Sequence, residues 1–225
     1  MTTKLFFFSF IICCSILSIS CSNEDETVYS CNESTNEWTK SNLLKIRQMT
    51  RSKWKLLSQS KKRAAYIAFT QSQKISFWKE KINNVLTLDW TKEEFKHINK
   101  VYEFICDNPI YFSEEELTDE QLNKFDLFFY EWIEDAQSVY KWDVKTIASI
   151  IASGDDMIDK TSTYSLDFET GGDVGAVSGP NCDCNMTYNF CSVGLQYYSC
   201  EDKDCIGTGT GCGILWTNSC NGMCE

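Results

Sequence analysis

The sequence predicts a mainly α protein, in which a small helical bundle domain precedes a small disulfide-rich C-terminal module of loops and short strands. All 11 glycines lie from Gly154 onward, so the preceding residues lack the turn chemistry that a many-stranded sheet needs. Eight of the 13 cysteines fall between Cys182 and Cys224, a density typical of disulfide scaffolds. The predicted organisation is a lipoprotein signal peptide at 1–20, an acidic tether at 21–33, a helical domain at 34–152, a flexible Gly-rich and acidic linker at 153–181 and an eight-cysteine module at 182–225.

Residues 1–20 have the pattern of a secretory signal peptide, with a basic start at Lys4 and an apolar stretch too short to span a bilayer comfortably. The small Ser20 before Cys21 is typical of bacterial lipoproteins and predicts cleavage there, with lipid attachment to Cys21. An ordinary signal peptide and an uncleaved anchor are the alternatives. The acidic run at 22–26 fits a surface-export signal or a solvated tether. We therefore expect an extracytoplasmic lipoprotein of the outer membrane or cell surface, held to the membrane by its N-terminal lipid.

Apolar side chains recur at helical spacing before Ser153, and several helix starts are recognisable. Capping boxes begin at Ser34, Thr91, Ser113 and Thr118. The predicted helices are 36–58, 62–72, 74–86, 91–106, 119–140 and 142–152. The clearest apolar stripe consists of Leu122, Phe125, Phe129, Trp132, Ala136 and Val139, and a second consists of Phe95, Ile98, Tyr102 and Ile105. We interpret the aromatic residues as core rather than as the lining of a ligand groove.

The chain is acidic, with a formal net charge of −11 and a pI near 4.7, which argues against nucleic acid as a partner. The charges are segregated along the sequence. Eleven basic residues and no acidic residue lie between Lys40 and Lys79, whereas residues 80–159 hold 19 acids and 7 bases. We expect the basic helices to pair with acidic ones inside the domain. The alternative is that they rest on phosphate-bearing lipid head groups.

No catalytic machinery is recognisable, so we expect a protein that is not an enzyme and that holds no cofactor or metal ion. His97 is the only histidine, and its position off the Phe95/Ile98 face predicts an exposed side chain with no acid–base role. The acidic run at 114–116 is expected to favour a helix start rather than to act in catalysis. The motifs of serine hydrolases, zinc proteases, P-loop proteins and dinucleotide-binding proteins do not occur.

The cysteines of the C-terminal module are expected to form disulfides, because an exported chain oxidises its thiols. They are Cys182, Cys184, Cys191, Cys200, Cys205, Cys212, Cys220 and Cys224, and their pairing cannot be deduced from spacing. A thiolate metal site or a redox motif is disfavoured, because the module holds no histidine and no C-x-x-C pair. Cys31 and Cys106 are candidates for a fifth bridge that closes the helical domain. The alternative leaves both unpaired.

The module contains three distinctive short motifs: Asn181-Cys182-Asp183-Cys184, Gly211-Cys212-Gly213 followed by Trp216, and Cys220-Asn221-Gly222-Met223-Cys224. This tail resembles bacteriocins of the fulvocin C-related family, and the layout of signal, helical region and tail is similar to that of the related proteins. The resemblance implies a small secreted antibacterial module. The module carries one base and five acids, a net −4 that suits electrostatic attack on anionic membranes poorly. Toxicity would therefore require an envelope receptor or target on competing bacteria.

The sequence leaves three hypotheses about function. The first is a lipoprotein that displays a bacteriocin-like module or, as an antibacterial precursor, releases it by cleavage within the linker at 153–181. The second is a non-toxic cell-surface lipoprotein whose disulfide-rich head binds an envelope partner. The third is an enzyme whose site has no recognisable motif.

Overall fold

The computed structural model describes residues 27–30, 32–160, 184–187, 200–201 and 208–224. Its helices are α1 (Glu33–Ser41), α2 (Leu43–Ile46), α3 (Arg51–Trp54), α4 (Gln59–Ile67), α5 (Gln71–Leu86), α6 (Lys92–Asp107), α7 (Asp119–Ser138) and α8 (Val144–Ile151), with 3₁₀ turns η2 (Pro109–Phe112) and η3 (Ile214–Trp216). Its strands are β1 (Cys200–Glu201), β2 (Thr208–Cys212), β3 (Asn218–Cys220) and β4 (Met223–Cys224). The predicted fold class is confirmed, because a mainly helical body precedes a small, disulfide-containing region of strands and loops.

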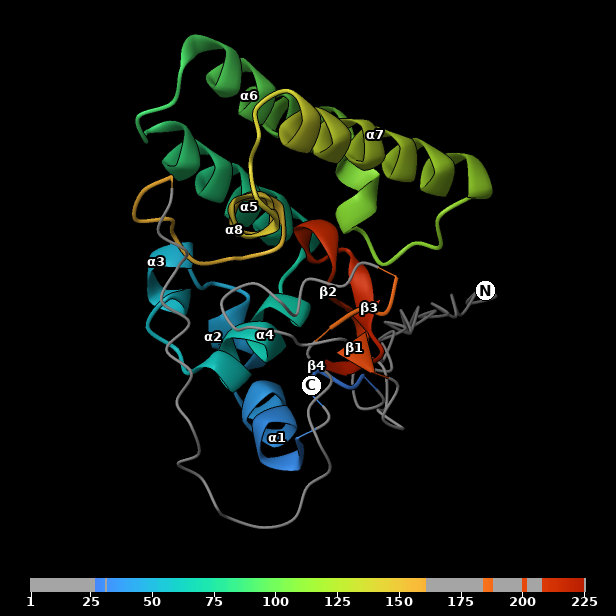
Figure 1. Ribbon diagram of the computed structural model, residues 1–225. Coiled ribbons are helices and arrows are strands. Elements are labelled where there is room, and N and C mark those ends of the chain that lie inside the picture. Colours follow the sequence, from blue (N-terminus) through green and yellow to red (C-terminus); the bar gives the residue numbers. More distant parts are fainter. Residues whose placement is uncertain (1–26, 31, 161–183, 188–199, 202–207, 225) are drawn as a thin grey trace, which may run out of the picture.

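The helices form a bundle in which α5 packs against α6, α7 against α8 and α1 against α4. In Figure 1, α6 and α7 lie across the top of the molecule, with α5 and α8 below them and α1 to α4 at the opposite end. A largely aromatic core fills the bundle, and its fully buried side chains include Trp54, Trp78, Trp132 and Phe129. The aromatic residues therefore form the core, as their helical spacing predicted.

Two of the predicted capping boxes are confirmed. Thr91 begins α6 and Thr118 begins α7, and in each case the residue three positions on returns a hydrogen bond to the cap. A third box, at Thr70, begins α5 inside the region that the sequence assigned to a single helix at 62–72. A cap at this position means that α4 and α5 change direction between Ile67 and Gln71, which turns both toward the same core.

The other two predicted boxes are wrong. Asn32, not Ser34, caps α1, because its side-chain oxygen accepts from the backbone N–H of Thr35 at 2.9 Å. No helix begins at Ser113, whose hydroxyl instead accepts from the backbone N–H of Glu115 at 3.2 Å in an irregular segment. The acidic residues at 114–116 therefore do not stand at a helix start, and α7 begins later, at Asp119.

The single helix expected at 36–58 is divided into α1, α2 and α3. The first break follows Ser41, where the Asn42 side chain donates to the carbonyl of Trp38 at 2.8 Å and competes with continuation of the helix. The second break is a turn at 47–50. The two changes of direction let both Ile46 and Trp54 enter the core, which the local sequence pattern did not reveal.

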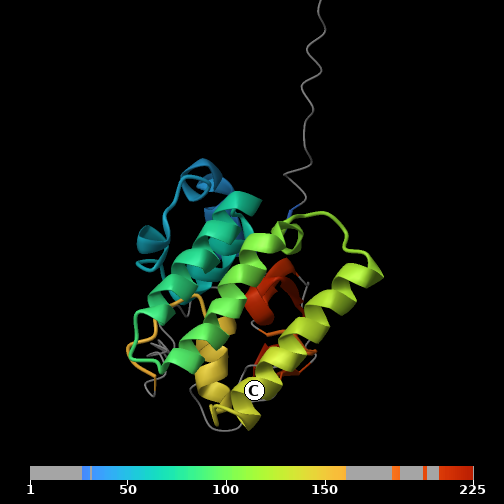
Figure 2. The same cartoon turned by 90° about the horizontal axis from the view of Figure 1, so that it is seen from above.

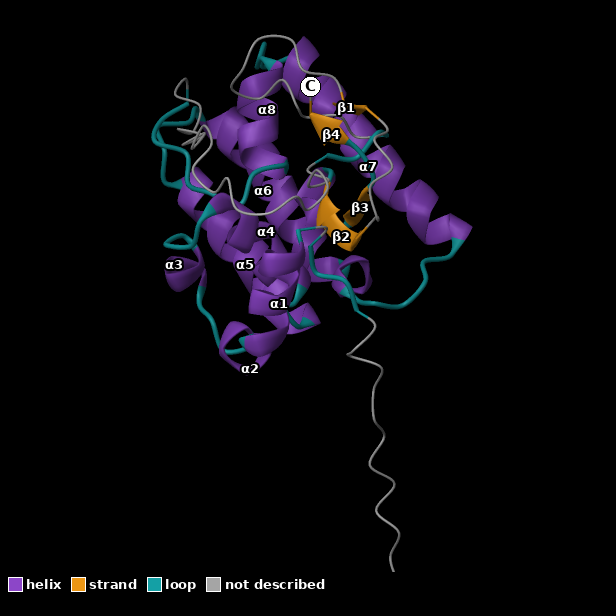
Figure 3. Ribbon diagram, turned by 90° about the horizontal axis from the view of Figure 1, so that it is seen from below, coloured by secondary structure: helices purple, strands orange, loops and turns teal. Residues whose placement is uncertain are grey.

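The C-terminal region contains two small antiparallel sheets, β1 with β4 and β2 with β3 (Figure 3). The disulfides Cys184–Cys200 and Cys212–Cys220 are present, so four of the eight expected module cysteines are confirmed as bridged. The first bridge joins the β1–β4 region to the segment at 184–187, and the second spans the ends of the β2–β3 hairpin. Of the remaining four, Cys182, Cys191 and Cys205 lie outside the described residues, and the backbone of Cys224 pairs with that of Cys200.

Of the other cysteines with a predicted role, only Cys106 lies within the described residues. Cys21, the expected lipid attachment point, and Cys31 lie outside the described residues. Cys106 carries a free, exposed thiol, so the structure does not contain the bridge that was expected to join it to Cys31. In the described part of the chain, no helix has the length and apolar character needed to cross a bilayer.

Candidate functional site

The C-terminal region is not a separate module, because η3 inserts into the core of the helical body. Ile214 and Leu215 are 0% exposed and Trp216 is 7% exposed. Viewed from above in Figure 2, the red η3 segment is visible in the gap between α6 and α7, and Figure 1 shows it below them. The Trp216 ring packs against aromatic rings of α3, α4 and α5. The ring centroids of Trp54, Tyr66, Phe77 and Trp78 are 5.8, 5.0, 6.1 and 6.0 Å from that of Trp216. We refer to this arrangement as the docking site.

Hydrogen bonds fix the inserted turn from both sides. The indole N–H of Trp216 donates to the carbonyl of Ala152 at 2.8 Å, and the hydroxyl of Tyr66 donates to the carbonyl of Leu215 at 3.1 Å. Burial raises the pKa of Tyr66 more than the hydrogen bond from Trp78 lowers it, so the hydroxyl remains a donor. The helical body thus satisfies the carbonyl of Leu215 and the indole N–H of Trp216, two polar groups that would otherwise be buried without partners.

The inserted turn has an unusual backbone that the flanking residues make possible. Leu215 and Trp216 have φ of 49° and 52°, in the left-handed region, where a residue with a side chain costs on the order of 1–3 kcal/mol. Gly213 precedes them at φ 71°, and a Cβ there would lie 2.5 Å from the Asn218 Oδ1. The Cys212–Cys220 bridge closes the hairpin around the turn. This strain persists because the aromatic pocket holds the side chains.

Residues 153–156, which the sequence assigned to a flexible linker, are instead held by basic side chains of the helical body. Arg51 donates to the carbonyl of Gly154 and pairs with Asp156, both at 2.6 Å, and Lys62 pairs with Asp155 at 2.7 Å. Lys81 donates to the carbonyl of Asp155. The linker prediction is therefore wrong for this segment, and the expected pairing between the basic segment and the acids of 80–159 is confirmed here.

Two of these groups have pKa values displaced from their usual range. Lys81 is 0% exposed, and burial, reinforced by Arg51, lowers its pKa to about 7 despite the opposing acids. Burial also acts to raise the pKa of Asp156, but the hydrogen bonds from Lys55 and Arg51 outweigh it and hold that pKa well below its usual range. Asp156 is therefore ionised, whereas Lys81 changes charge near neutral pH.

Gly154 brings the linker backbone against the docking site. A Cβ at this position would lie 2.7 Å from a ring carbon of Phe77, 2.8 Å from Trp54 and 3.0 Å from Trp216. Only a residue without a side chain fits between the three rings. The far end of the segment is fixed as well, because Lys160 pairs with Glu94 at 3.0 Å. The rest of the predicted linker, 161–181, lies outside the described residues.

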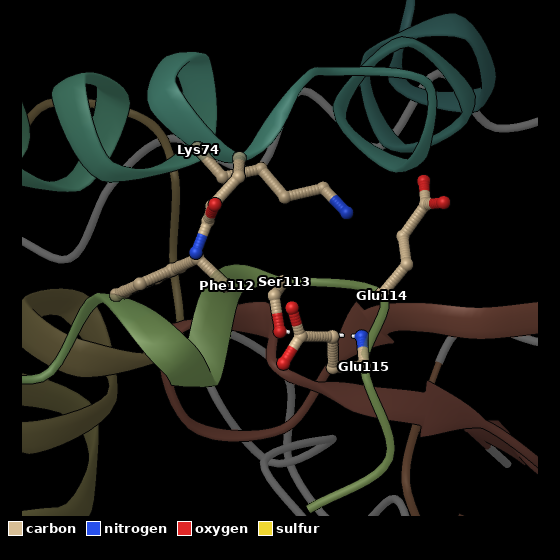
Figure 4. A pocket seen from close by; sticks show the side chains of 6 residues that line it. Lys74, Phe112, Ser113, Glu114 and Glu115 are labelled. Atoms are coloured by element: carbon tan, nitrogen blue, oxygen red, sulfur yellow. Dashed lines mark hydrogen bonds between the residues drawn. The ribbon is translucent and has the colours of Figure 1, made fainter.

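A cavity of about 400 Å³ lies at the edge of the docking site. Gln71 and Lys74 of α5 form one wall, and Phe112 with the residues at 113–115 forms the other (Figure 4). Lys74 is 3% exposed, and its ammonium group donates to the Thr210 hydroxyl of β2 at 3.4 Å. Burial lowers the pKa of Lys74, and the attraction of Glu114 opposes this effect. This cavity could not be recognised in the sequence, because its walls come from two segments about 40 residues apart, 71–74 and 112–115.

His97 was expected to be exposed, and this prediction is wrong because the side chain is 1% exposed. Its ring stacks on Trp132 with centroids 4.8 Å apart, and its Nε2 lies 3.0 Å from the carbonyl of Trp132. The indole of Trp132 donates back to the carbonyl of His97 at 2.9 Å. Burial lowers the pKa of His97, so the ring is neutral at physiological pH. Through these contacts His97 packs α6 against α7.

The helical stripes explain this error. On α6 the buried face consists of His97, Ile98, Val101, Phe104 and Ile105, so Phe95 is exposed. On α7 the middle of the predicted stripe is buried, whereas both of its ends, Leu122 and Val139, are exposed. Among the described residues, no group of three or more His, Cys, Asp or Glu side chains is arranged to hold a metal ion.

Comparison of the chain with known protein families, with curated proteins and with solved structures found no match in any of the three.

Proposed function

We propose that this protein works as one intact folded body: an extracytoplasmic, lipid-anchored binding protein, not an enzyme, whose disulfide-rich region stays docked on the helical bundle. The observation that carries this proposal is the burial of Ile214, Leu215 and Trp216 in the helical core. Burying one apolar side chain of this size stabilises a protein by roughly 1.5–3 kcal/mol. Separating the two parts would therefore cost several kcal/mol and leave an aromatic pocket open to water.

The proposed location is the outer membrane or cell surface, with a lipid on Cys21. The Cys184–Cys200 and Cys212–Cys220 disulfides are compatible with an oxidising, extracytoplasmic compartment. Metabolic labelling with an alkyne fatty acid tests the anchor. Cys21→Ala should abolish labelling, whereas Cys14→Ala, within the predicted signal peptide, should retain it. A labelled Cys21→Ala protein would place the lipid elsewhere.

A bacteriocin precursor is the competing candidate, and the fulvocin C-like order of cysteines, glycines and Trp216 favours it. In that case the helical body would cover the apolar turn of the module until a protease freed it. The docking site counts against release, because two residues of the resemblance fit the module onto the helical body: Gly211 packs against Ile67 of α4, and Trp216 packs against rings of α4 and α5.

Cutting the chain between the two parts distinguishes the candidates. A protease site placed between Gly171 and Gly172 allows the purified, oxidised protein to be cleaved without changing a described residue. We expect the two pieces to co-elute in size-exclusion chromatography and to separate only in denaturant. The same cleavage in a Trp216→Ala protein should release the module at a lower denaturant concentration. Spontaneous separation of the wild-type pieces would contradict the proposal.

Cultures of the source bacterium supply the biological test. Intact mass spectrometry of membranes and supernatant should find the full-length protein on cells and no free module. The purified protein, cleaved or uncleaved, should leave lawns of related bacteria unaffected. A module-sized peptide in the supernatant, together with clearing zones that disappear on reduction, would establish the bacteriocin and overturn the intact-protein proposal.

A further inference from the structure

The cavity beside Lys74 presents opposite charges from facing walls. In Figure 4 the ammonium group of Lys74 extends from α5 and the carboxylate of Glu114 extends from the segment after η2, with open space between them. Beside Glu114, the same wall also offers an apolar side chain, the buried Phe112. The hydrogen bond from Gln71 Nε2 to the carbonyl of Pro109, 2.9 Å long, holds the two walls together. The volume of about 400 Å³ is within the range of small-molecule sites.

Among the described residues, Lys74 is attracted by Glu114 but forms no ion pair with it. A buried ammonium group is normally paired with a carboxylate and fills its three N–H donors. Lys74 instead has one long hydrogen bond, 3.4 Å to Thr210, and the Tyr66 ring at 5.9 Å. None of the ion pairs between described residues includes Lys74. Donor capacity therefore remains, on a buried cation at the wall of a cavity.

Facing charges of opposite sign select the kind of ligand. A ligand with only a negative charge would meet Glu114 and Glu115, and one with only a positive charge would meet Lys74, so each would leave a repulsive contact. We propose that this cavity binds a zwitterionic α-amino acid or short peptide, whose carboxylate pairs with Lys74 and whose ammonium group pairs with Glu114. Phe112 then contacts the carbon skeleton between the two charges.

This inference rests on the proposed function in one respect: Thr210, the residue that positions the Lys74 ammonium group, belongs to β2 of the disulfide-rich region. The site is complete only while that region stays docked. A binding protein with a fixed module therefore has a use for the docking that a released toxin would not.

Four alanine derivatives of nearly equal size test the charge requirement on the intact, oxidised protein. L-Alanine carries both charges, N-acetyl-L-alanine only the negative one, L-alaninamide at about pH 6.5 mainly the positive one, and N-acetyl-L-alaninamide neither. Titrations followed by ¹H–¹⁵N correlation spectra should show binding of L-alanine at least about tenfold tighter than that of the other three. L-Alanyl-L-alanine, titrated in parallel, separates a site for free amino acids from one for peptides.

Matched variants test the residues. Lys74→Met and Glu114→Gln should each weaken binding of the zwitterion by about tenfold or more. Lys79→Met, on the same helix but over Tyr102, and Glu116→Gln, in the same acidic run but outside the cavity lining, should leave it unchanged. Glu114 is exposed, so its variant remains informative if Lys74→Met does not fold.

Three results would overturn the inference: no spectral change with either zwitterion at about 20 mM, equal binding of N-acetyl-L-alanine, or unaltered binding by Glu114→Gln. These outcomes are separate from failure of the proposed function, which shows as a cleaved, freely dissociating module in the chromatography and culture experiments. An intact protein that binds no zwitterion would remove only the ligand assignment.

Discussion

Replacing Trp216 with alanine measures how far the disulfide-rich region and the helical body depend on each other. The indole is 7% exposed, packs against four aromatic rings and donates to the carbonyl of Ala152, so the substitution leaves a cavity inside the helical core. A buried Trp→Ala change costs about 3–5 kcal/mol. For a chain of this size each kcal/mol lowers Tm by roughly 2–4 °C, so Tm should fall by roughly 10 °C.

Far-UV circular dichroism is the appropriate assay, because its signal comes from the helices and not from the region that carries the mutation. Met186→Ala is the matched control, since Met186 belongs to the same disulfide-rich region and is 48% exposed. Its free energy of unfolding should stay within about 0.5 kcal/mol of the wild-type value. If Trp216→Ala shifted the helical transition no more than the control does, the two parts would fold independently and the docking argument would be refuted.

Three further perturbations test the contacts around the docking site. Gly154→Ala should destabilise the protein by about 1–3 kcal/mol in urea unfolding, because its Cβ would meet three rings, whereas Gly209→Ala, where a Cβ meets nothing, should not; equal effects would contradict the packing. Between pH 7 and about 9.5 the unfolded chain binds more protons than the folded one at Lys81, so wild-type stability should rise with pH, and an equally steep rise in Lys81→Met would show that another group is responsible. The double variant Cys212→Ser/Cys220→Ser should lower the free energy of unfolding by about 2.5 kcal/mol. An unchanged midpoint of helix unfolding, followed by circular dichroism, would mean that the hairpin does not support the docked turn.

The helical body could be predicted because its signals are local. The capping boxes at Thr91 and Thr118 and the central stripe of α7 depend on residues within a few positions of one another. His97 was misplaced for a related reason. A neutral imidazole is compatible with either a core or a surface, and only the rings of Trp132 and Tyr140, which come from α7 and the turn after it, decide between the two.

The docking site could not be predicted, because each of its parts looks ordinary in its own stretch of sequence. Gly154 looks like part of a linker, and Lys74 and Lys81 look like parts of a solvated helical face, since lysine is rarely fully buried. One available signal was the apolar run Ile214-Leu215-Trp216 near the end of the tail. Three consecutive large apolar residues favour burial, although the sequence does not say against which part of the chain.

The positions of the basic residues bear on the alternative in which the basic helices rest on lipid head groups. Arg51, Lys62 and Lys74 are buried, and Arg51 and Lys62 are paired with acids of the segment at 153–156. A side chain that holds an internal carboxylate cannot also reach a phosphate at the membrane surface. For Arg51 and Lys62, the charge segregation in the sequence therefore corresponds to an interior contact. That contact fixes the start of the segment that leads to the disulfide-rich region, while Trp216 fixes the region itself, and the two contacts adjoin because Trp216 donates to the carbonyl of Ala152.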